Sequence, residues 1–331
     1  MKNVKWLLID STDPFVNLTL EELILRDPEI KDDVVFFYQN DHTVFIGRNQ
    51  NAYQEVNLDY AHENDVKIFR RISGGGAVYQ DMGNINFSYI THSKGNYETF
   101  LKPVVGFLES LGLEVAYKGR NDLSVNGFKV SGNAQYATPS RMVHHGTILI
   151  NINLDVMQKV LRVNPLKLKS KGIKSISQRV ASINSLLKKP MEVSEFKKQL
   201  VNWFIEKYNA QKFEIPYERY ALKWASLAAE KSSHQWIYGK SPLFEVSNED
   251  KFEGGIMKVN YTVKNSRFEN FKFEGDYLSQ TDTEDISSAL IGVEYNRNKI
   301  YETLAKFKYS DYFGTITLEE IIDLIMGKKE V

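Results

Sequence analysis

The chain has 331 residues, of which 42% are hydrophobic, enough for one large core or for a large domain and a small one. Lysine and arginine total 42, as do aspartate and glutamate, so the net charge is zero and gives no global reason to coat nucleic acid or acidic membranes. The sequence contains no cysteine, which excludes disulfides, thiolate metal sites and thiol nucleophiles.

The N-terminus carries only a short apolar run, Trp6 to Ile9, before Asp10. This run is too short for a signal peptide, and no other run approaches the ~18 apolar residues of a membrane span. We therefore expect a cytoplasmic protein with neither a membrane nor a nucleic acid as partner.

The first helix is expected from Asp13, its N-cap, to the residue before Pro28, with Pro14 in its first turn. Alternating patterns then predict two hairpins, one pairing strands 34–38 and 43–46, the other joining strands 77–79 and 85–90 through the turn 80–83. Other expected elements are helix 57–64, strand 66–69, helix 97–111 closed by Gly112, strands within 115–136 and 146–151, and helix 192–209.

The character of the chain changes after Pro242, where a polar stretch with two glycines follows. Beyond it we expect a hairpin from 256–263 and 268–277, then two helices, the last opened by Thr317 and Glu320 as a capping box. We predict an α+β protein with a large domain, 1–247, built on mixed and mostly antiparallel sheets flanked by helices, and a small α+β domain, 248–331.

The stretch RRISGGGAVYQDMGN, residues 70–84, contains three consecutive glycines, which are costly in backbone entropy. It is not a dinucleotide-binding fingerprint, because Tyr79 stands where the third glycine is needed, and the GKS at 239–241 lacks the earlier glycine of a Walker loop. Free backbone N–H groups next to Arg70 and Arg71 suit an anion such as phosphate or carboxylate. A glycine-rich turn needed only for packing is the alternative.

The dipeptide Asn126-Gly127 predicts a two-residue type I′ hairpin turn, which fixes the strand register. Val125 then faces Phe128, Ser124 faces Lys129, Leu123 faces Val130 and Asp122 faces Ser131. Asp122 and Lys129 become diagonal neighbours, roughly 7–8 Å apart at Cβ, so a carboxylate can hold the ammonium in place. An ordinary ion pair on a solvent-facing hairpin remains the alternative.

The six histidines do not predict a metal site, because His144 and His145 are adjacent and would point to opposite faces of a strand. No HExxH or H-x-H pattern is present. We expect a structural or substrate-shaping role for one of them instead.

At this point the sequence resembles the lipoate–protein ligases, over most of its length and in the order of that family's motifs. The similar stretches are DPFVNLTLEELIL, TVFIGRNQNAYQEVN, RRISGGGAVYQDMGNINFS, GRNDLSVNGFKVSGNAQY, HHGTILIN and KGIKSISQRVASI. The long members of that family also have a small C-terminal domain after the catalytic one. The resemblance implies the biotin/lipoyl ligase fold, which is similar to class II synthetases.

The resemblance further implies two reaction steps: lipoate and ATP give lipoyl-AMP and pyrophosphate, and the lipoyl group then passes to a lysine of an acceptor protein. The implied acceptors are apo lipoyl domains of 2-oxoacid dehydrogenases and the glycine cleavage H protein, and the implied state is a monomer. Mg²⁺ would accompany ATP; its ligands are unknown, and no tightly bound prosthetic group is expected.

The site residues carried over from the family fall into three groups. The catalytic pair is Lys129 and Asp122. The ATP-binding residues are Arg71, Gly76, Ala77, Val78, Tyr79 and Lys129, and the lipoate-binding residues are Arg48, Ser73, Gly74, Gly75, Lys129 and His145. Leu18, Phe45 and Val78 are expected to line an apolar tunnel for the acyl tail, with simple core packing as the alternative.

Three alternative functions can be compared with this one. The related octanoyltransferases work through a cysteine, which this chain lacks. A biotin–protein ligase has a similar fold, but its glycine loop is interrupted by arginine. A non-catalytic module that binds lipoate or lipoyl domains would bind lipoate without releasing pyrophosphate.

Overall fold

The computed structural model describes residues 4–92, 95–119, 121–162, 179–238 and 246–327. None of the helices in these ranges combines the length and the apolar composition that a bilayer-spanning helix needs. The resembling motif at 171–183 is described only from residue 179, and the GKS at 239–241 lies outside the described residues.

Eight of the described strands form one mixed sheet, in the order β11-β1-β2-β6-β10-β9-β8-β7. The strands β11, β1 and β2 are parallel, and the other neighbours are antiparallel, as the predicted fold class requires. The strand bounds are β1 Val4–Leu8, β2 Asp33–Tyr38, β6 Asn84–Thr91, β7 Val115–Lys118, β8 Asp122–Val125, β9 Phe128–Ala137, β10 Met142–Leu149 and β11 Gln211–Lys212.

A second sheet has the order β4-β3-β5, with bounds β4 Lys67–Arg70, β3 Thr43–Ile46 and β5 Val78–Gln80. Both predicted hairpins are therefore wrong, although their strands are present. Strand β2 pairs with β1 and β6, while β3 pairs with β4 and β5. Strand β6 likewise pairs with β2 and β10 rather than with β5. The short loops carry the chain from one sheet to the other instead of folding it back on itself.

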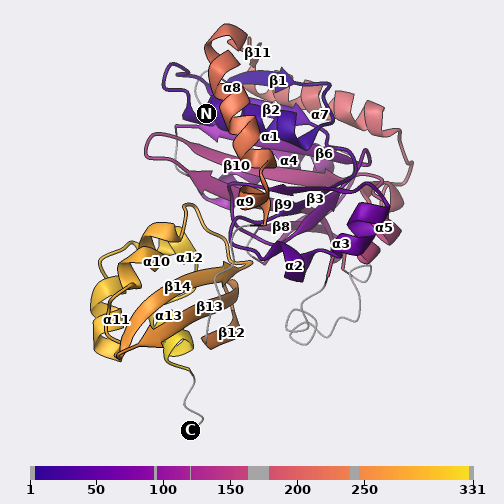
Figure 1. Ribbon diagram of the computed structural model, residues 1–331. Helices are drawn as coiled ribbons and strands as arrows, with labels where there is room; N and C mark the ends of the chain where they lie inside the picture. The colour runs from indigo at the N-terminus through magenta and orange to yellow at the C-terminus, as the bar shows by residue number, and fades with distance from the viewer. Residues whose placement is uncertain (1–3, 93–94, 120, 163–178, 239–245, 328–331) are drawn as a thin grey trace.

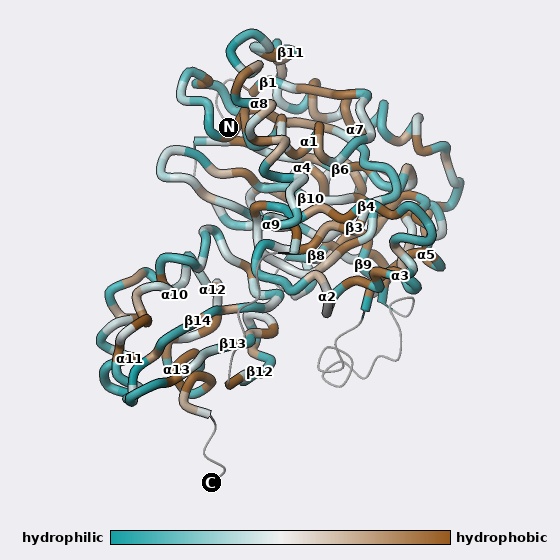
Figure 2. Tube along the Cα trace, in the orientation of Figure 1, coloured by the Kyte–Doolittle hydropathy of each residue, from teal (hydrophilic) through white to brown (hydrophobic). Residues whose placement is uncertain are grey.

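Alternation along β2 separates two cores on the two faces of the large sheet. Val35 and Phe37 pack with the helices α4 (Tyr97–Ser110) and α7 (Val193–Tyr208). Val34, Phe36 and Tyr38 pack with α1 (Pro14–Arg26), with α8 (Tyr217–Ser232) and with residues of the small sheet. Figure 1 shows α1 and α8 next to each other across the large sheet, and Figure 2 shows hydrophobic segments along many of the strands.

The helices of this part are α1 Pro14–Arg26, α2 Ala52–Glu55, α3 Leu58–Glu63, α4 Tyr97–Ser110, α5 Leu154–Val160, α7 Val193–Tyr208, α8 Tyr217–Ser232, α9 His234–Ile237 and the 3₁₀ turn Ile183–Ser185. The start of α1 follows the sequence prediction, because Asp13 accepts a hydrogen bond from the backbone N–H of Phe15. The predicted helices 57–64, 97–111 and 192–209 are also confirmed, within a residue or two of their ends.

The C-terminal part forms a third sheet and its own apolar core. The predicted hairpin is confirmed as β13 Gly255–Lys264 and β14 Arg267–Gly275, and β12 Val246–Phe252 pairs with β13. The prediction of two helices is wrong, because four follow within residues 276–327: α10 Glu284–Leu290, α11 Arg297–Leu304, α12 Tyr309–Phe313 and α13 Leu318–Met326. Thr317 and Glu320 form the predicted capping box of α13. The division at residue 248 remains a prediction.

Candidate active site

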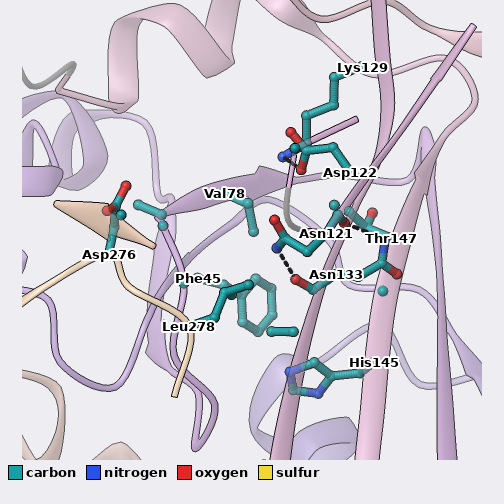
Figure 3. A pocket seen from close by; sticks show the side chains of 18 of the residues that line it. Phe45, Val78, Asn121, Asp122, Lys129, Asn133, His145, Thr147, Asp276 and Leu278 are labelled. Carbon is teal, nitrogen blue, oxygen red and sulfur yellow. Dashed lines mark hydrogen bonds and ion pairs between the residues drawn. The ribbon is translucent and has the colours of Figure 1, made fainter. Parts of the chain in front are cut away.

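A cavity of about 770 Å³ lies between the large sheet, the small sheet and the C-terminal part. Its floor is one row of register partners across the large sheet: Tyr38, Asn86, Thr147, Gly132 and Asp122. Since register partners in a sheet share a face, all five face the same space. Figure 3 shows Lys129 and Asp122 at one end of the cavity, His145 at the other, and Phe45 and Val78 between them.

At the charged end of the cavity, a carboxylate lies between two cations. The Lys129 ammonium lies 2.7 Å from Asp122 Oδ1, and the Arg179 guanidinium lies 2.7 Å from Asp122 Oδ2. Burial alone would raise the pKa of Asp122, but the charges and hydrogen bonds of Lys129 and Arg179 outweigh it and lower that pKa. Asp122 is buried and the pair lines the cavity, so it is not an ordinary ion pair on a solvent-facing hairpin.

The hairpin that carries this pair turns at Asn126-Gly127, whose φ angles of 51° and 82° confirm the predicted type I′ turn. Ser124 faces Lys129 as predicted, but Leu123 faces Ser131 and Asp122 faces Gly132. The last two predicted pairs are therefore wrong by one residue, because a bulge in β9 intervenes. Asp122 now lies opposite a glycine, where a Cβ would come 2.9 Å from Lys129 Nζ. The bulge thus provides room for the lysine beside its carboxylate.

The backbone of Lys129 is also held by hydrogen bonds to the segment 179–181. Its N–H donates to the Arg179 carbonyl at 2.7 Å, and the Ala181 N–H donates to the Lys129 carbonyl at 3.1 Å. Arg179 therefore contacts both the backbone of the lysine and the carboxylate that pairs with it. Arg179 is not among the predicted site residues, because contact between residues this far apart in sequence leaves no local pattern.

The two consecutive arginines have different surroundings. Arg70 donates to five backbone carbonyls, in residues 47, 48, 50, 236 and 237. It therefore has a structural role and links the segment 47–50 to the segment 236–237. Arg71 lines the cavity and donates to the carbonyls of Phe45, Gly74 and Gly76. Burial lowers the pKa of Arg71 to about 10, yet leaves it charged at neutral pH. Because its partners are neutral carbonyls, Arg71 brings a buried positive charge to the cavity.

The glycine loop is covered by the C-terminal part of the chain. The Gly75 N–H donates to the Tyr277 carbonyl at 3.1 Å, and a Cβ on Gly74 would lie 2.7 Å from Ser279 N and 2.8 Å from Tyr277 O. Gly75 has φ of +90°, which favours glycine. The backbone of residues 277–279 therefore leaves no room for a side chain at Gly74.

At the other end of the cavity, His145 is held between two buried groups. Its Nδ1 lies 3.1 Å from Glu21 and its Nε2 lies 2.6 Å from Ser73 Oγ. A carboxylate next to Nδ1 makes that nitrogen the donor. Glu21 lies on α1 and was missed, because a glutamate in an amphipathic helix usually reads as a solvent-facing residue.

His144 points away from the cavity, as predicted from its place next to His145 on β10. It packs against the rings of Phe100 and Tyr97, and burial lowers its pKa to about 3. In the unfolded chain His144 has an ordinary pKa near 6.5. Between about pH 6.5 and 3 the unfolded chain therefore binds a proton at His144 that the folded chain does not bind.

We therefore expect the free energy of unfolding to fall as the pH drops below about 6.5, by up to about 1.4 kcal/mol per pH unit from this residue. A His144→Phe variant is expected to show a shallower loss between pH 6.5 and 4 in urea unfolding. The control is His62→Gln, at an exposed position on α3. Parallel pH profiles for wild type and His144→Phe would contradict the assignment.

The structure brings together eight of the predicted site residues around the cavity: Arg71, Gly75, Gly76, Ala77, Val78, Asp122, Lys129 and His145. Leu18, Phe45 and Val78, predicted for an apolar tunnel, also line it. Four predicted residues do not line the cavity: Arg48, Ser73, Gly74 and Tyr79. Arg48 pairs with Asp282 of the C-terminal part and stacks on Trp236, and the Tyr79 ring packs in a separate core. Their ligand contacts remain predictions.

Acidic and histidine side chains do not gather into a group of three that could hold a metal within the described ranges. The cavity lining does include the carboxylates of Asp122, Glu253 and Asp276. Such a set fits Mg²⁺ only as an ion carried mainly by phosphate oxygens, which is how Mg²⁺ commonly binds with nucleotides.

Two protein families match the chain by sequence. The one described as "Lipoyl protein ligase A/B catalytic domain" matches residues 13–205, and "Bacterial lipoate protein ligase C-terminus" matches residues 241–325. Lipoate–protein ligase 1 from Staphylococcus aureus is 38% identical over 324 residues, which cover 95% of this chain and 97% of the relative.

Solved structures agree with these matches. P. falciparum LipL1, solved in complex with lipoate, is 22% identical and gives a TM-score of 0.81 over 98% of each chain, a likeness of fold alone. A lipoate-protein ligase A bound with ATP is 26% identical, with a TM-score of 0.60 over 72% of this chain and 99% of that one.

Proposed function

This chain belongs to the lipoate–protein ligase family, and from that premise we propose that it activates free lipoate with ATP and transfers the lipoyl group to a lysine of an acceptor protein. The observation that carries the proposal is the fixed ammonium of Lys129, held 2.7 Å from Asp122 at one end of a cavity that Arg71 also lines. We propose apo lipoyl domains and the glycine cleavage H protein as acceptors, and a monomer as the active state.

In the first step a lipoate carboxylate oxygen bonds to the α-phosphorus of ATP, and the bond from that phosphorus to pyrophosphate breaks. Two anions must approach each other, so a fixed cation between them is the largest available catalytic contribution. Lys129 would contact both the carboxylate and the α-phosphate. Arg71 would face the phosphates, and Mg²⁺ bound with ATP would offset the charge of the leaving group.

In the second step the acceptor amine attacks the lipoyl carbonyl, and AMP leaves. Asp122 was predicted to position that amine or to accept its proton. Both of its oxygens are engaged by cations and its pKa is lowered, which makes a carboxylate a weak base. We therefore propose that Asp122 is a positioning residue for Lys129.

An Asp122→Asn variant separates these roles. We expect pyrophosphate release with lipoate and ATP to fall roughly tenfold or more, because an amide holds the ammonium less firmly. Transfer from preformed lipoyl-AMP to an apo lipoyl domain should retain the pH profile of the wild type, shifted only in rate. A transfer profile that loses its acidic limb in Asp122→Asn, where the rate falls as a base is protonated, would identify Asp122 as the base.

We also propose that residues 1–247 carry both reaction steps and that 248–331 form an accessory domain. The accessory part contributes residues such as Phe252, Ile256 and Leu278 to the cavity lining, and it contacts the glycine loop through Tyr277. These contacts support a role in closing the site over its ligands.

A further inference from the structure

The Gln80 side chain lines the cavity beside apolar residues of the small sheet. Gln80 and Val78 lie two residues apart on β5 and so share a face, and Phe45 pairs with Val78 on the neighbouring strand. Leu18 and Tyr38 line the same region. Gln80 is buried, with 7% of its surface exposed.

A chain of buried carboxamides fixes which atom Gln80 presents to the cavity. Asn17 Nδ2 lies 2.9 Å from the Ser11 carbonyl and 2.8 Å from the Gln39 carbonyl, so this atom must be the nitrogen. It also donates to Asn40 Oδ1 at 2.9 Å, which leaves Asn40 Nδ2 to donate to Gln80 Oε1 at 2.9 Å.

The Gln80 amide nitrogen is then the last group in this series of hydrogen-bonded carboxamides. Within the described ranges it has no hydrogen-bond partner, and neither flipping Asn40 nor flipping Gln80 alone is compatible with the orientation of Asn17. Asn17 and Asn40 are almost completely buried, so this orientation is rigid. Gln80 therefore presents an N–H donor, and not an acceptor, to the cavity beside these apolar residues.

This donor lies far from the reacting end. Tyr38, two residues before Asn40, is four strands from Asp122 along the floor row, roughly 15–20 Å at the usual strand spacing. The Lys129 side chain and an extended eight-carbon acid can fill that length together. The far end of the acyl tail, and not its carboxylate, would then lie next to Gln80.

From these contacts we propose that Gln80 selects the acyl tail, favouring one whose far end carries a hydrogen-bond acceptor over one that ends in a methyl group. The inference rests on the proposed function and specifies its substrate. The sulfur atoms of the lipoate ring are weak acceptors, whereas octanoate ends in a methyl group that leaves the Gln80 donor unsatisfied. A site built to donate a hydrogen bond rejects analogues that cannot accept it.

The test compares lipoate with octanoate, using lipoate-dependent and octanoate-dependent pyrophosphate release by the full chain. We expect the wild type to favour lipoate in kcat/KM by about tenfold or more. Gln80→Met removes the donor, and Gln80→Glu removes it while keeping an acceptor for Asn40. Both variants should bring the ratio of the two kcat/KM values close to one.

The matched control is Gln199→Met, a half-buried glutamine on α7 outside the cavity lining, which should leave the ratio unchanged. Equal efficiency of the wild type on the two acids would overturn the proposal, and this result does not depend on how the variants fold. An unchanged ratio in both Gln80 variants would overturn it as well. No pyrophosphate release with either acid would overturn the proposed function and this inference with it.

Discussion

Replacing Lys129 with methionine is expected to lower the rate of lipoate-dependent pyrophosphate release by roughly 100- to 1,000-fold. Methionine keeps most of the side-chain length but removes the charge that would lie between the lipoate carboxylate and the α-phosphate. It also leaves Asp122 with Arg179 as its remaining partner within the described residues. Single-turnover release of pyrophosphate, measured with saturating lipoate and ATP, checks this expectation.

The matched control is Lys299→Met, at an exposed helical position in the C-terminal part. That variant should release pyrophosphate at the wild-type rate. Thermal unfolding must be similar in all three proteins for the comparison to concern chemistry. A Lys129→Met enzyme within threefold of the wild type would remove the central cation from the mechanism.

Gly47→Ala is expected to cause the second large loss, a fall of about 100-fold in kcat/KM for ATP. A Cβ at this position would lie 2.0 Å from the carbonyl oxygen of Gly75, a contact between two backbones that no side-chain rotation relieves. The glycine loop must then move, and with it the carbonyls of Gly74 and Gly76 that hold Arg71. The overpacking should also destabilise the fold by roughly 1–3 kcal/mol.

Gly106→Ala on α4 serves as the control for Gly47→Ala, because its added Cβ would meet Trp203 at an ordinary 3.4 Å. That change should leave the kinetics unaltered and raise stability by up to about 1 kcal/mol through helix propensity. Steady-state kinetics and urea unfolding of both variants give the comparison. Normal ATP kinetics in Gly47→Ala would show that the position of the loop does not matter for nucleotide binding.

Local signals predicted most of the helices and strands, but not which strands pair. The cap at Asp13 and the capping box of Thr317 and Glu320 are contacts between near neighbours in sequence, so they can be predicted from sequence alone. The pairing of β3 with β4 and β5 depends instead on the apolar faces of the whole domain. A strand that ends in a short loop can fold back or cross to another sheet, and local residues do not decide between them.

In the candidate site, too, contacts between near neighbours in sequence could be predicted and contacts between distant segments could not. The Asn126-Gly127 turn predicted that Asp122 and Lys129 lie together, and the structure places their charged atoms 2.7 Å apart. The bulge in β9 and the arrival of Arg179 could not be predicted, because both depend on packing between distant segments. The glycines were predicted to approach a ligand, whereas Gly74 packs against residues 277–279 of a part of the chain more than 200 residues away.

The most direct test of the central claim is the mass of an apo lipoyl domain after incubation with the full chain, lipoate and Mg-ATP. We predict a mass gain of one lipoyl group on a single lysine, accompanied by pyrophosphate release, with both signals lost in Lys129→Met. Lipoate binding without pyrophosphate release or mass gain would contradict the proposed reaction and identify a binding module instead. Mass gain with biotin and not with lipoate would contradict the substrate.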